Sequence, residues 1–518
     1  MSGGGAAAMR KVAEFSELAE GRGKRVEIGE EKILLVRDGD AVRAYAAACP
    51  HAGAPLEEGA VCGGRIVCPW HKGTFRVSDG ALLEPPALAS LARYPVRVDE
   101  GGAVLVSPEK VPPERPAETP DGRAMVIVGA GAAGAAAAAA LRGFGFGGRV
   151  VLVGREAGPP YDRTSLSKFA VSGEMPPDEV PPLLPPAFFE ERRIERVEGE
   201  VVRLDATAKR VHTADGRTLP YDAALVATGG APKRLDIPGA GLAGVHVLRD
   251  RADAAAILAD AREGARAVVI GAGFIGLEAA SALRKRGVEI SVVTPEPVPF
   301  GKQFGPRLGA MFKELHEANG IAFRLGTQAS RLEGAGRVEA VALEDGARLA
   351  ADLVVAGVGV RPATGFVHGL DLAEDGGVPV DAAMRAAEGL YAAGDVALFP
   401  LPGGGEPTRI EHWRVAQQHA RVAARNMLGG SERYEGVPYF WTYHYGKRFD
   451  YLGHATEWDE VVVEGDTAEH VFVALLVKDG KVAGALGCQR EWATAMLSER
   501  MRSPLPLDEA LGIVRAAA

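Results

Sequence analysis

Two segments, far apart in the chain, repeat one local pattern: a short apolar run, a glycine-rich turn and a helix rich in small residues. They read MVIVGAGAAGAAAAAA over residues 125–140 and AVVIGAGFIGLEAA over residues 267–280. An apolar strand that enters a helix through such a turn is typical of a dinucleotide-binding βαβ unit. One copy alone is weak, but two copies together predict an α/β protein with two dinucleotide sites.

The glycines of each turn have separate roles in such a unit. The first permits the tight turn, the second lets the backbone approach a pyrophosphate at the helix N-terminus, and the third lets the helix pack closely on the sheet. These glycines are Gly129, Gly131 and Gly134 in the first copy, and Gly271, Gly273 and Gly276 in the second.

The rest of the chain divides by composition. Residues 20–107 hold six short β runs broken by glycine, which predicts a small antiparallel domain, and a proline-rich linker follows. The tail from about residue 432 returns to aromatic and β-branched runs and ends in a helix, which indicates an α+β domain. The expected units are an all-β domain at 10–107, a linker at 108–122, a first dinucleotide domain split into 123–238 and 351–430, a second inserted at 239–350, and the α+β domain at 431–518.

Composition excludes several classes of protein. The formal net charge of −9 and the few basic clusters argue against nucleic acid or an anionic membrane as a partner. The N-terminal stretch lacks the apolar segment of a signal peptide, and no apolar run is long enough to span a bilayer. Four cysteines are too few for a disulfide scaffold, so we expect a reducing, cytoplasmic setting.

Two short strings carry metal-ligand chemistry. CPH supplies Cys49 and His51, and after sixteen intervening residues CPWH supplies Cys68 and His71. Two thiolates on one iron and two imidazoles on the other define a Rieske [2Fe–2S] centre. A Cys₂His₂ zinc site is the alternative, but zinc fingers keep the two cysteines and the two histidines in separate pairs. Cys62 lies between the two strings and is interpreted as a small apolar residue.

Around these residues the chain resembles the Rieske ferredoxins of bacterial ring-hydroxylating dioxygenases. It differs from the respiratory Rieske proteins, because Ala54 and Trp70 stand where their loop disulfide would form. Gly73 and Phe75 stand where hydroxyl donors to the cluster would be expected. Fewer donors to the cluster sulfurs imply a potential in the lower part of the Rieske range of roughly −150 to +300 mV.

The segment PYDRTSLSK at 160–168 resembles the segment that crosses the isoalloxazine ring of FAD in oxygenase-coupled ferredoxin reductases and in the apoptosis-inducing factor family. In that resemblance Arg163 and Lys168 contact the isoalloxazine of FAD, although Thr164 and Ser165 replace two prolines. A cation at this position would stabilise the reduced flavin. The family's disulfide reductases carry a cysteine pair after the first glycine motif. Because residues 130–168 contain no cysteine, disulfide reductase chemistry is not expected here.

The same resemblance assigns the two nucleotide sites by their order. Residues 221–229 (YDAALVATG) and 391–396 (YAAGDV) resemble the two FAD-binding strands that flank an inserted nicotinamide domain. Asp395 would hold the ribityl chain, with an ordinary helix cap as its alternative, and Asp222 is interpreted as a turn residue. Trp413 and Trp441 either cover the flavin or pack in a core. The FAD set also includes Glu156, which follows the next strand and suits a ribose hydroxyl, together with Ala227, Thr228 and Gly229.

The second site has weaker determinants. Its strand EISVVT ends at Thr294, Glu296 follows two residues later, and no Arg or Lys lies immediately after the strand to meet a 2′-phosphate, which favours NADH over NADPH. Glu278, on the helix after the second turn, either faces the nicotinamide or is an exposed helix charge. Gly359 completes this set.

Two functions follow from the resemblance, which covers nearly the whole chain. The first is an NAD(P)H oxidoreductase that passes electrons through FAD and the Rieske cluster, with Lys168 and Glu278 as catalytic residues. Its acceptor would be an oxygenase, a cytochrome or a ferredoxin, and the protein would be a monomer or a homodimer. The alternative is a redox-sensing flavoprotein of the apoptosis-inducing factor type.

Overall fold

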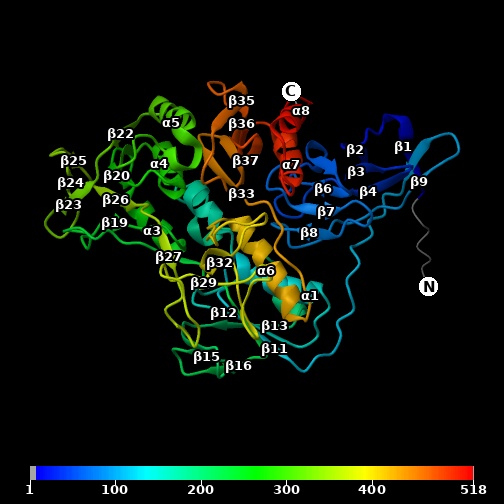
Figure 1. Ribbon diagram of the computed structural model, residues 1–518, viewed down its shortest axis with the longest axis horizontal. Helices are drawn as coiled ribbons and strands as arrows, with labels where there is room; N and C mark the ends of the chain where they lie inside the picture. Colours follow the sequence, from blue (N-terminus) through cyan, green and yellow to red (C-terminus); the bar gives the residue numbers. More distant parts are fainter. Residues whose placement is uncertain (1–7, 517–518) are drawn as a thin grey trace.

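The computed structural model describes residues 8–516, which form four packed units (Figure 1). The N-terminal unit contains three small antiparallel sheets, in the orders β1-β10-β9, β2-β3-β4 and β5-β6-β7-β8. Its core strand β3 holds the four apolar residues 33–36, none of which is exposed. The strands are β1 (Arg10–Glu14), β2 (Gly23–Ile28), β3 (Glu31–Asp38), β4 (Ala41–Ala46), β5 (Ala60–Cys62), β6 (Arg65–Val67), β7 (Thr74–Arg76), β8 (Leu82–Glu84), β9 (Val96–Val98) and β10 (Ala103–Val106).

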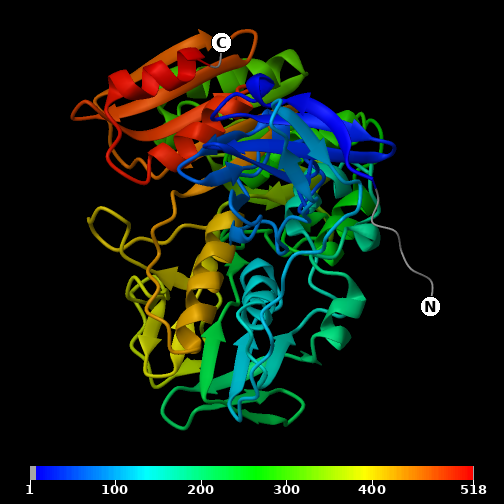
Figure 2. The ribbon, with the colours of Figure 1, turned by 90° about the vertical axis from the view of Figure 1, so that its right-hand side faces the viewer.

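The first dinucleotide unit is built on a six-stranded sheet in the order β13-β12-β11-β17-β31-β30. Its strands are parallel except for the edge strand β30, and the first glycine turn leaves the sheet at β11. Helices α1 and α6 pack against each other beside this sheet (Figure 2). The elements are β11 (Ala124–Val128), α1 (Ala132–Gly143), β12 (Arg149–Gly154), α2 (Pro186–Glu191), β13 (Ile194–Glu198), β17 (Ala223–Val226), β30 (Arg385–Ala387), β31 (Leu390–Ala392) and α6 (Trp413–Met427).

The second dinucleotide unit has a five-stranded parallel sheet in the order β19-β26-β20-β21-β22, with a small sheet β23-β24-β25 beside it. Strand β26 pairs with β20 along its whole length, so this unit extends beyond the expected end at residue 350. The elements are β19 (Val245–His246), α3 (Arg251–Asp260), β20 (Arg266–Ile270), α4 (Phe274–Lys285), β21 (Glu289–Thr294), α5 (Gly301–Ala318), β22 (Ile321–Leu325), β23 (Ala329–Glu333), β24 (Ala340–Leu343), β25 (Arg348–Ala350) and β26 (Leu353–Ala356).

The C-terminal unit is an antiparallel sheet in the order β33-β34-β37-β36-β35, with two helices after it. Figure 1 shows this unit between the second dinucleotide unit and the N-terminal unit. The C-terminal unit shares one apolar cluster with the second dinucleotide unit. It shares a smaller cluster with the N-terminal unit, formed by Ala60, Val67 and Ala495. The elements are β33 (Tyr439–His444), β34 (Lys447–Gly453), β35 (Glu460–Asp466), β36 (Val471–Lys478), β37 (Lys481–Cys488), α7 (Glu491–Arg500) and α8 (Leu507–Ala516).

Short elements complete the chain between these units. A 3-10 turn at Arg163–Ser165 runs into a π-helical turn at Leu166–Ala170, and this pair positions the basic residues of the PYDRTSLSK segment. Among residues 8–516, no helix combines the length and apolarity needed to cross a bilayer. The remaining strands are β14 (Val201–Asp205), β15 (Arg210–Thr213), β16 (Thr218–Pro220), β18 (Gly230–Pro232), β27 (Val360–Pro362), β28 (Val367–His368), β29 (Val378–Pro379) and β32 (Ala397–Leu398).

Candidate functional site

A cavity of about 460 Å³ lies at the carboxyl end of the six-stranded sheet, where β11 enters α1. Its wall combines the first glycine turn, the 163–168 turns, the end of β17, the start of α6 and strand β33. Most of the residues proposed for FAD line this cavity together, namely Gly129, Gly131, Glu156, Arg163, Lys168, Ala227, Thr228, Gly229, Asp395, Trp413 and Trp441. Gly134 lies one helical turn behind them, in α1.

The glycine turn has the geometry that a bound pyrophosphate needs. At Gly129, where φ is +115°, a Cβ atom would lie 2.3 Å from the Ala227 carbonyl oxygen, and at Gly134 it would lie 1.8 Å from the Gly129 carbonyl oxygen. At Gly131 a Cβ atom would have no protein neighbour within 4 Å, because that side of the turn faces the cavity. The free N-terminus of α1 therefore points at open space, where it can bind an anion.

Polar groups without a protein partner also line this cavity. Within the described part of the chain, His412 Nδ1 and Trp413 Nε1 are buried and make no hydrogen bond. Buried polar atoms normally have partners, so these two suit the polar edge of a bound cofactor. Asp395 is not a helix cap, since the residue before its 3-10 turn is Ala393; its carboxylate accepts a 3.5 Å bond from Arg249 Nη2.

Glu156 and Arg163 form an ion pair with each other at one end of the cavity. Tyr161 joins them, because its hydroxyl donates to Glu156 Oε2 at 2.7 Å and accepts from Arg163 Nη1 at 3.0 Å. Burial opposes the charge on Glu156, but Arg163 outweighs burial and holds the pKa of this carboxyl below its usual value. The lowered pKa favours the carboxylate form of Glu156 on the cavity wall.

Lys168 and Glu278 form a buried ion pair on another wall of the cavity. The Lys168 Nζ atom lies 2.9 Å from Glu278 Oε2, and the two residues are 9% and 5% exposed. Ser167 Oγ donates to the same carboxylate oxygen at 2.5 Å. Glu278 is thus not an exposed helix charge, and α4 brings it from the second dinucleotide unit to the first cavity.

The second glycine turn repeats the geometry of the first one. A Cβ atom at Gly271 would lie 2.4 Å from the Gly357 carbonyl oxygen, whereas at Gly273 it would meet nothing within 4 Å. Gly276 packs helix α4 against the turn in the same way as Gly134 packs α1. Gly359 has φ of +93° with open space beside it, and Glu296 lies after β21, paired with Lys302 at 2.5 Å. This open turn suits a second dinucleotide.

The four proposed iron ligands come together in the N-terminal unit. The Nδ1 atoms of His51 and His71 lie 3.1 Å apart, and Cys49 and Cys68 are 3% and 1% exposed. A hydrogen bond between the two thiols raises the pKa of Cys49, and burial lowers the pKa of both imidazoles. Neutral imidazole is the form that binds iron.

This arrangement argues against the zinc alternative. Within residues 8–516, no three His, Cys, Asp or Glu side chains are placed to hold one metal ion, which a zinc site would require. A cluster with two irons instead needs one ligand pair for each iron, and the thiol pair and the imidazole pair provide this. Of the other cysteines, Cys62 lies half-buried on β5 and Cys488 is buried on β37.

The Trp441 side chain lies between His71 and the cavity. The Trp441 ring lies 4.3 Å from the His71 ring, measured between centroids, and it also lines the cavity. Lys168 Nζ lies 5.8 Å from the centroid of the same indole. Trp441 therefore joins the proposed cluster to the proposed flavin site by direct contact.

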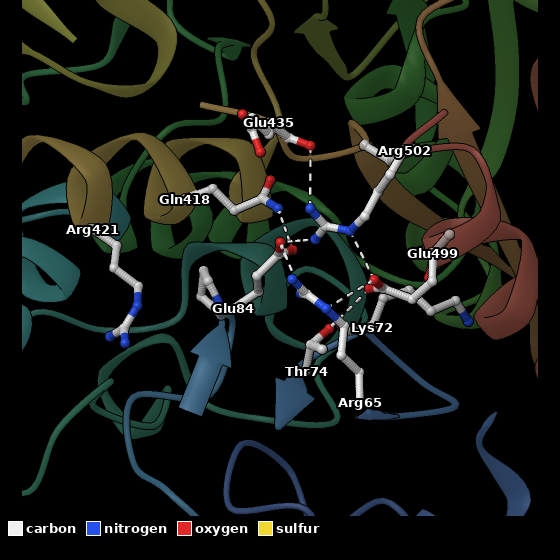
Figure 3. A network of polar contacts seen from close by, with 12 residues as sticks. Arg65, Lys72, Thr74, Glu84, Gln418, Arg421, Glu435, Glu499 and Arg502 are labelled. Atoms are coloured by element: carbon white, nitrogen blue, oxygen red, sulfur yellow. Dashed lines mark hydrogen bonds and ion pairs between the residues drawn. The ribbon is translucent and has the colours of Figure 1, made fainter. Parts of the chain in front are cut away.

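A buried polar network fixes the N-terminal unit in this position (Figure 3). At its centre, Glu84 of β8 accepts from Arg414 Nη2 at 2.6 Å and from Gln418 Nε2 at 2.7 Å, and it also pairs with Arg502. Arg414, which is 1% exposed, donates a further bond to the carbonyl of Lys72, the residue directly after the proposed ligand His71. The network thus joins the N-terminal, first dinucleotide and C-terminal units.

A second buried pair contacts the cluster loop. Lys72 Nζ lies 2.8 Å from Asp450 Oδ2, and neither side chain is exposed by more than 4%. The Tyr439 hydroxyl oxygen lies 2.7 Å from the Trp70 carbonyl oxygen and 2.9 Å from Asp450 Oδ1, so its single proton is donated to one of these two acceptors at a time. Sequence reasoning missed these partners, since no motif marks them; the one signal was the cluster of aromatic residues in VPYFWTYHY.

The fold and the site together define a class of protein: a two-dinucleotide flavoprotein oxidoreductase with a fused Rieske domain. Residues 123–420 match the pyridine nucleotide-disulphide oxidoreductase family, residues 8–95 match the Rieske [2Fe-2S] domain, and residues 439–510 match the reductase C-terminal domain. The chain belongs to the pyridine nucleotide-disulphide oxidoreductase family. Its cofactors are FAD, NAD(P)H and a [2Fe–2S] cluster, and the predicted fold class is confirmed.

Individual relatives agree with this placement. The mouse (Mus musculus) apoptosis-inducing factor 3 is 35% identical over 510 residues, which cover 95% of this chain and 84% of that protein. The ferredoxin–NAD(+) reductase component of the biphenyl dioxygenase system of Paraburkholderia xenovorans is 36% identical, over 72% of this chain and 91% of its own. The ferredoxin reductase for the CYP199A2 system of Rhodopseudomonas palustris superposes with a TM-score of 0.71 at 32% identity, over 76% of this chain and 100% of its own.

Proposed function

We propose that this protein oxidises NAD(P)H, with NADH preferred, and delivers the electrons singly through its own Rieske cluster to a separate acceptor protein. The acceptor is a ferredoxin, a cytochrome or an oxygenase component. A bound flavin supplies the conversion between a two-electron donor and one-electron transfers. The supporting observation is the position of Trp441, in contact with both the proposed cluster ligand His71 and the flavin cavity.

The protein's own residues perform distinct tasks in this reaction. Lys168 places a positive charge at the cavity wall, where negative charge develops as hydride arrives, and Glu278 holds that ammonium in place. The two glycine turns bind the pyrophosphates. The interdomain network around Glu84 and Arg414 keeps the cluster loop against the cavity, so that the electron path stays short in every molecule.

Replacement of a cluster ligand tests the order of electron transfer. In His71→Ala, NADH should reduce the flavin at the wild-type rate, whereas reduction of cytochrome c by the holoenzyme should be lost. If cytochrome reduction persists at the wild-type rate, the Rieske domain is not on the path.

The same assay separates the redox-sensing alternative, which the similarity to apoptosis-inducing factor 3 supports. A sensor would be reduced by NADH and would then turn over every one-electron acceptor slowly, even with its cluster intact. Rapid turnover by wild type that depends on the cluster supports the oxidoreductase.

A further inference from the structure

A chain of buried polar side chains leaves the flavin cavity from Glu278, away from the cluster. Glu278 Oε1 accepts a hydrogen bond from Thr442 Oγ1 at 2.8 Å, and Thr442 Oγ1 lies 2.9 Å from His444 Nε2. Farther out, His316 Nδ1 lies 3.2 Å from the Tyr445 hydroxyl. We propose that these residues form the proton exit of the enzyme, leading from the Lys168–Glu278 pair to the surface at Tyr445.

The need for such an exit follows from the proposed function, on which this inference rests. A hydride carries two electrons and one proton, whereas the Rieske cluster passes on electrons alone. The balance is NAD(P)H plus two oxidised one-electron acceptors giving NAD(P)⁺, two reduced acceptors and one proton. That proton is left in the cavity in each turnover and must reach the solvent.

The outward path begins at the ion pair. Lys168 Nζ contacts Glu278 Oε2, and Thr442 contacts the other oxygen of the same carboxylate. A carboxylate can therefore accept a proton from the ammonium side and release it on the hydroxyl side. Glu278 is 5% exposed and Thr442 is fully buried, so bulk water does not reach this step.

The histidine pair forms the middle of the path. The rings of His444 and His316 are 5.0 Å apart between centroids, and both residues have no exposed surface. In the described part of the chain, His444 Nδ1 and His316 Nε2 are buried without a hydrogen-bond partner. No hydrogen bond joins the two rings directly, so a proton crosses between them only when one of the rings turns toward the other.

The surroundings keep both rings in the form that relays protons. Phe300, Phe312 and Phe449 pack around His444, and burial lowers its pKa to about 3. Burial also lowers the pKa of His316 well below its ordinary value. A neutral imidazole carries one donor and one acceptor nitrogen, so it can take a proton on one side and release it on the other.

The exit lies at the turn after β33. Tyr445 is half-buried, and its backbone N–H donates to Ser281 Oγ at 3.2 Å, which fixes the turn on α4 one helical turn from Glu278. Helices α4 and α5, strand β33 and the turn after it thus supply the groups of the path beyond Lys168, and none of these groups is a proposed ligand of the cluster.

The test follows protons and electrons separately in the holoenzyme. NADH and cytochrome c are mixed with the protein in weakly buffered solution, with a pH indicator dye reporting protons and cytochrome absorbance reporting electrons. Thr442→Val keeps the side-chain shape and removes the relay hydroxyl. We expect it to slow proton release and the linked second electron transfer by about tenfold or more. Reduction of the flavin by NADH without an acceptor should stay at the wild-type rate.

A matched control distinguishes the path from burial alone. His419 is also fully buried, its pKa is also lowered to about 3, and it lies on α6 outside the path. His419→Phe should release protons at the wild-type rate, whereas His444→Phe should release protons more slowly than wild type. If a variant fails to fold, Tyr445→Phe provides the test instead. It removes one hydroxyl at the half-buried end of the path and should also slow proton release.

Nitrogen-15 NMR of histidine-labelled holoenzyme gives a readout that does not depend on turnover. His444 should be neutral at neutral pH, with one hydrogen-bonded nitrogen whose resonance shifts in Thr442→Val. Proton release at the wild-type rate in Thr442→Val and Tyr445→Phe, or a charged His444, would overturn the relay. Absence of NADH-driven cytochrome reduction in wild type would instead overturn the proposed function.

Discussion

Lys168 illustrates how one buried charge sets the chemistry of the cavity. Its ammonium pairs with the Glu278 carboxylate and donates to the Thr164 carbonyl at 3.1 Å, and little solvent screens it because the side chain is buried. Because a fixed charge in a dry site costs no reorganisation, it stabilises developing negative charge strongly. Lys168→Met should slow flavin reduction by NADH about 10²-fold in stopped-flow measurements.

The control for this variant is Lys313→Met, since Lys313 pairs with Glu317 on the surface of α5. That change should leave flavin reduction unaffected. A wild-type rate of flavin reduction in Lys168→Met would contradict a catalytic role for the ammonium.

The Lys72–Asp450 pair makes a prediction about stability. Burial opposes the charge on Asp450, but Lys72 and Arg448 outweigh it and hold the pKa of the carboxyl below its usual value. Asp450→Asn leaves the ammonium buried without its counter-charge, which should cost about 3–5 kcal/mol in the free energy of unfolding. The loss of Rieske visible absorbance in increasing urea measures it.

Two further variants check that assignment. Lys72→Met combined with Asp450→Asn removes both charges and should regain part of the lost stability. Asp459→Asn breaks only the exposed pair with Lys478 and should change stability by less than about 1 kcal/mol. Equal losses in the buried and exposed variants would contradict this account.

At this scale, the sequence predicted residues that belong to short motifs. The ligand strings and glycine turns could be read directly, because their chemistry fixes both residue type and spacing. Thr442, Asp450 and Arg414 could not, since each meets its partner across more than 160 residues or between units. Glu278 was left open between two interpretations because only packing decides whether a helix position is exposed.

At the scale of elements, helix α6 connects the two redox sites. Its first residue, Trp413, lines the cavity, and the next one, Arg414, holds the carbonyl after the ligand His71. Arg414→Leu should therefore loosen the N-terminal unit and slow cluster reduction after mixing with NADH. Stopped-flow absorbance of the cluster gives the rate, and limited proteolysis of the linker at 108–122 reports the loosening.

Arg425→Leu is the control on the same helix, since Arg425 is exposed in its last turn over the Phe144 ring. Cluster reduction and linker cleavage should match wild type there. If the rate of cluster reduction is unchanged in Arg414→Leu, then Arg414 on α6 does not hold the N-terminal unit in place.

The elements themselves were predicted unevenly. Strands with clear apolar runs, such as β3 with KILLV and β4 with AVRAY, lie where these runs indicated them. Strand β2, with the sequence GKRVEI, was missed because three of its side chains are charged, and pairing with β3 decides its conformation. In the C-terminal unit, β33 and β36 were indicated by aromatic and β-branched runs, whereas the edge strand β35, with the sequence EVVVEGD, was not singled out because its three valines form only a short run between charged residues.

Across the whole molecule, buried neutral histidines predict sensitivity to acid. Burial lowers the pKa values of His412, His419 and His444 to about 3, whereas an unfolded histidine titrates near 6.5. The contribution of these neutral histidines to the free energy of unfolding is complete above about pH 6.5. It is lost as the pH falls toward 3, at about 1.4 kcal/mol per histidine per pH unit.

Urea midpoints measured between neutral and mildly acidic pH check this prediction. The urea midpoint of wild type should fall steeply as the pH is lowered. The midpoint of His419→Phe should fall less steeply, because this variant lacks one of the histidines that take up a proton on unfolding. A midpoint that is independent of pH over this range would contradict neutral burial of these side chains.

Domain order could be predicted from the sequence, because each unit has its own pattern. The contacts between units could not, and these contacts determine the function. Trp441 belongs to the C-terminal unit, His71 to the N-terminal unit and Lys168 to the first dinucleotide unit, yet they meet at one point. No local pattern encodes a meeting of three domains.

The most direct test of the account is EPR spectroscopy of the purified holoenzyme, frozen within milliseconds of mixing with NADH. The account predicts that a Rieske-type signal of the reduced cluster develops in wild type and is lost in His71→Ala, while the flavin is reduced by NADH in both. A flavin reduced by NADH beside a wild-type cluster that stays oxidised would contradict it.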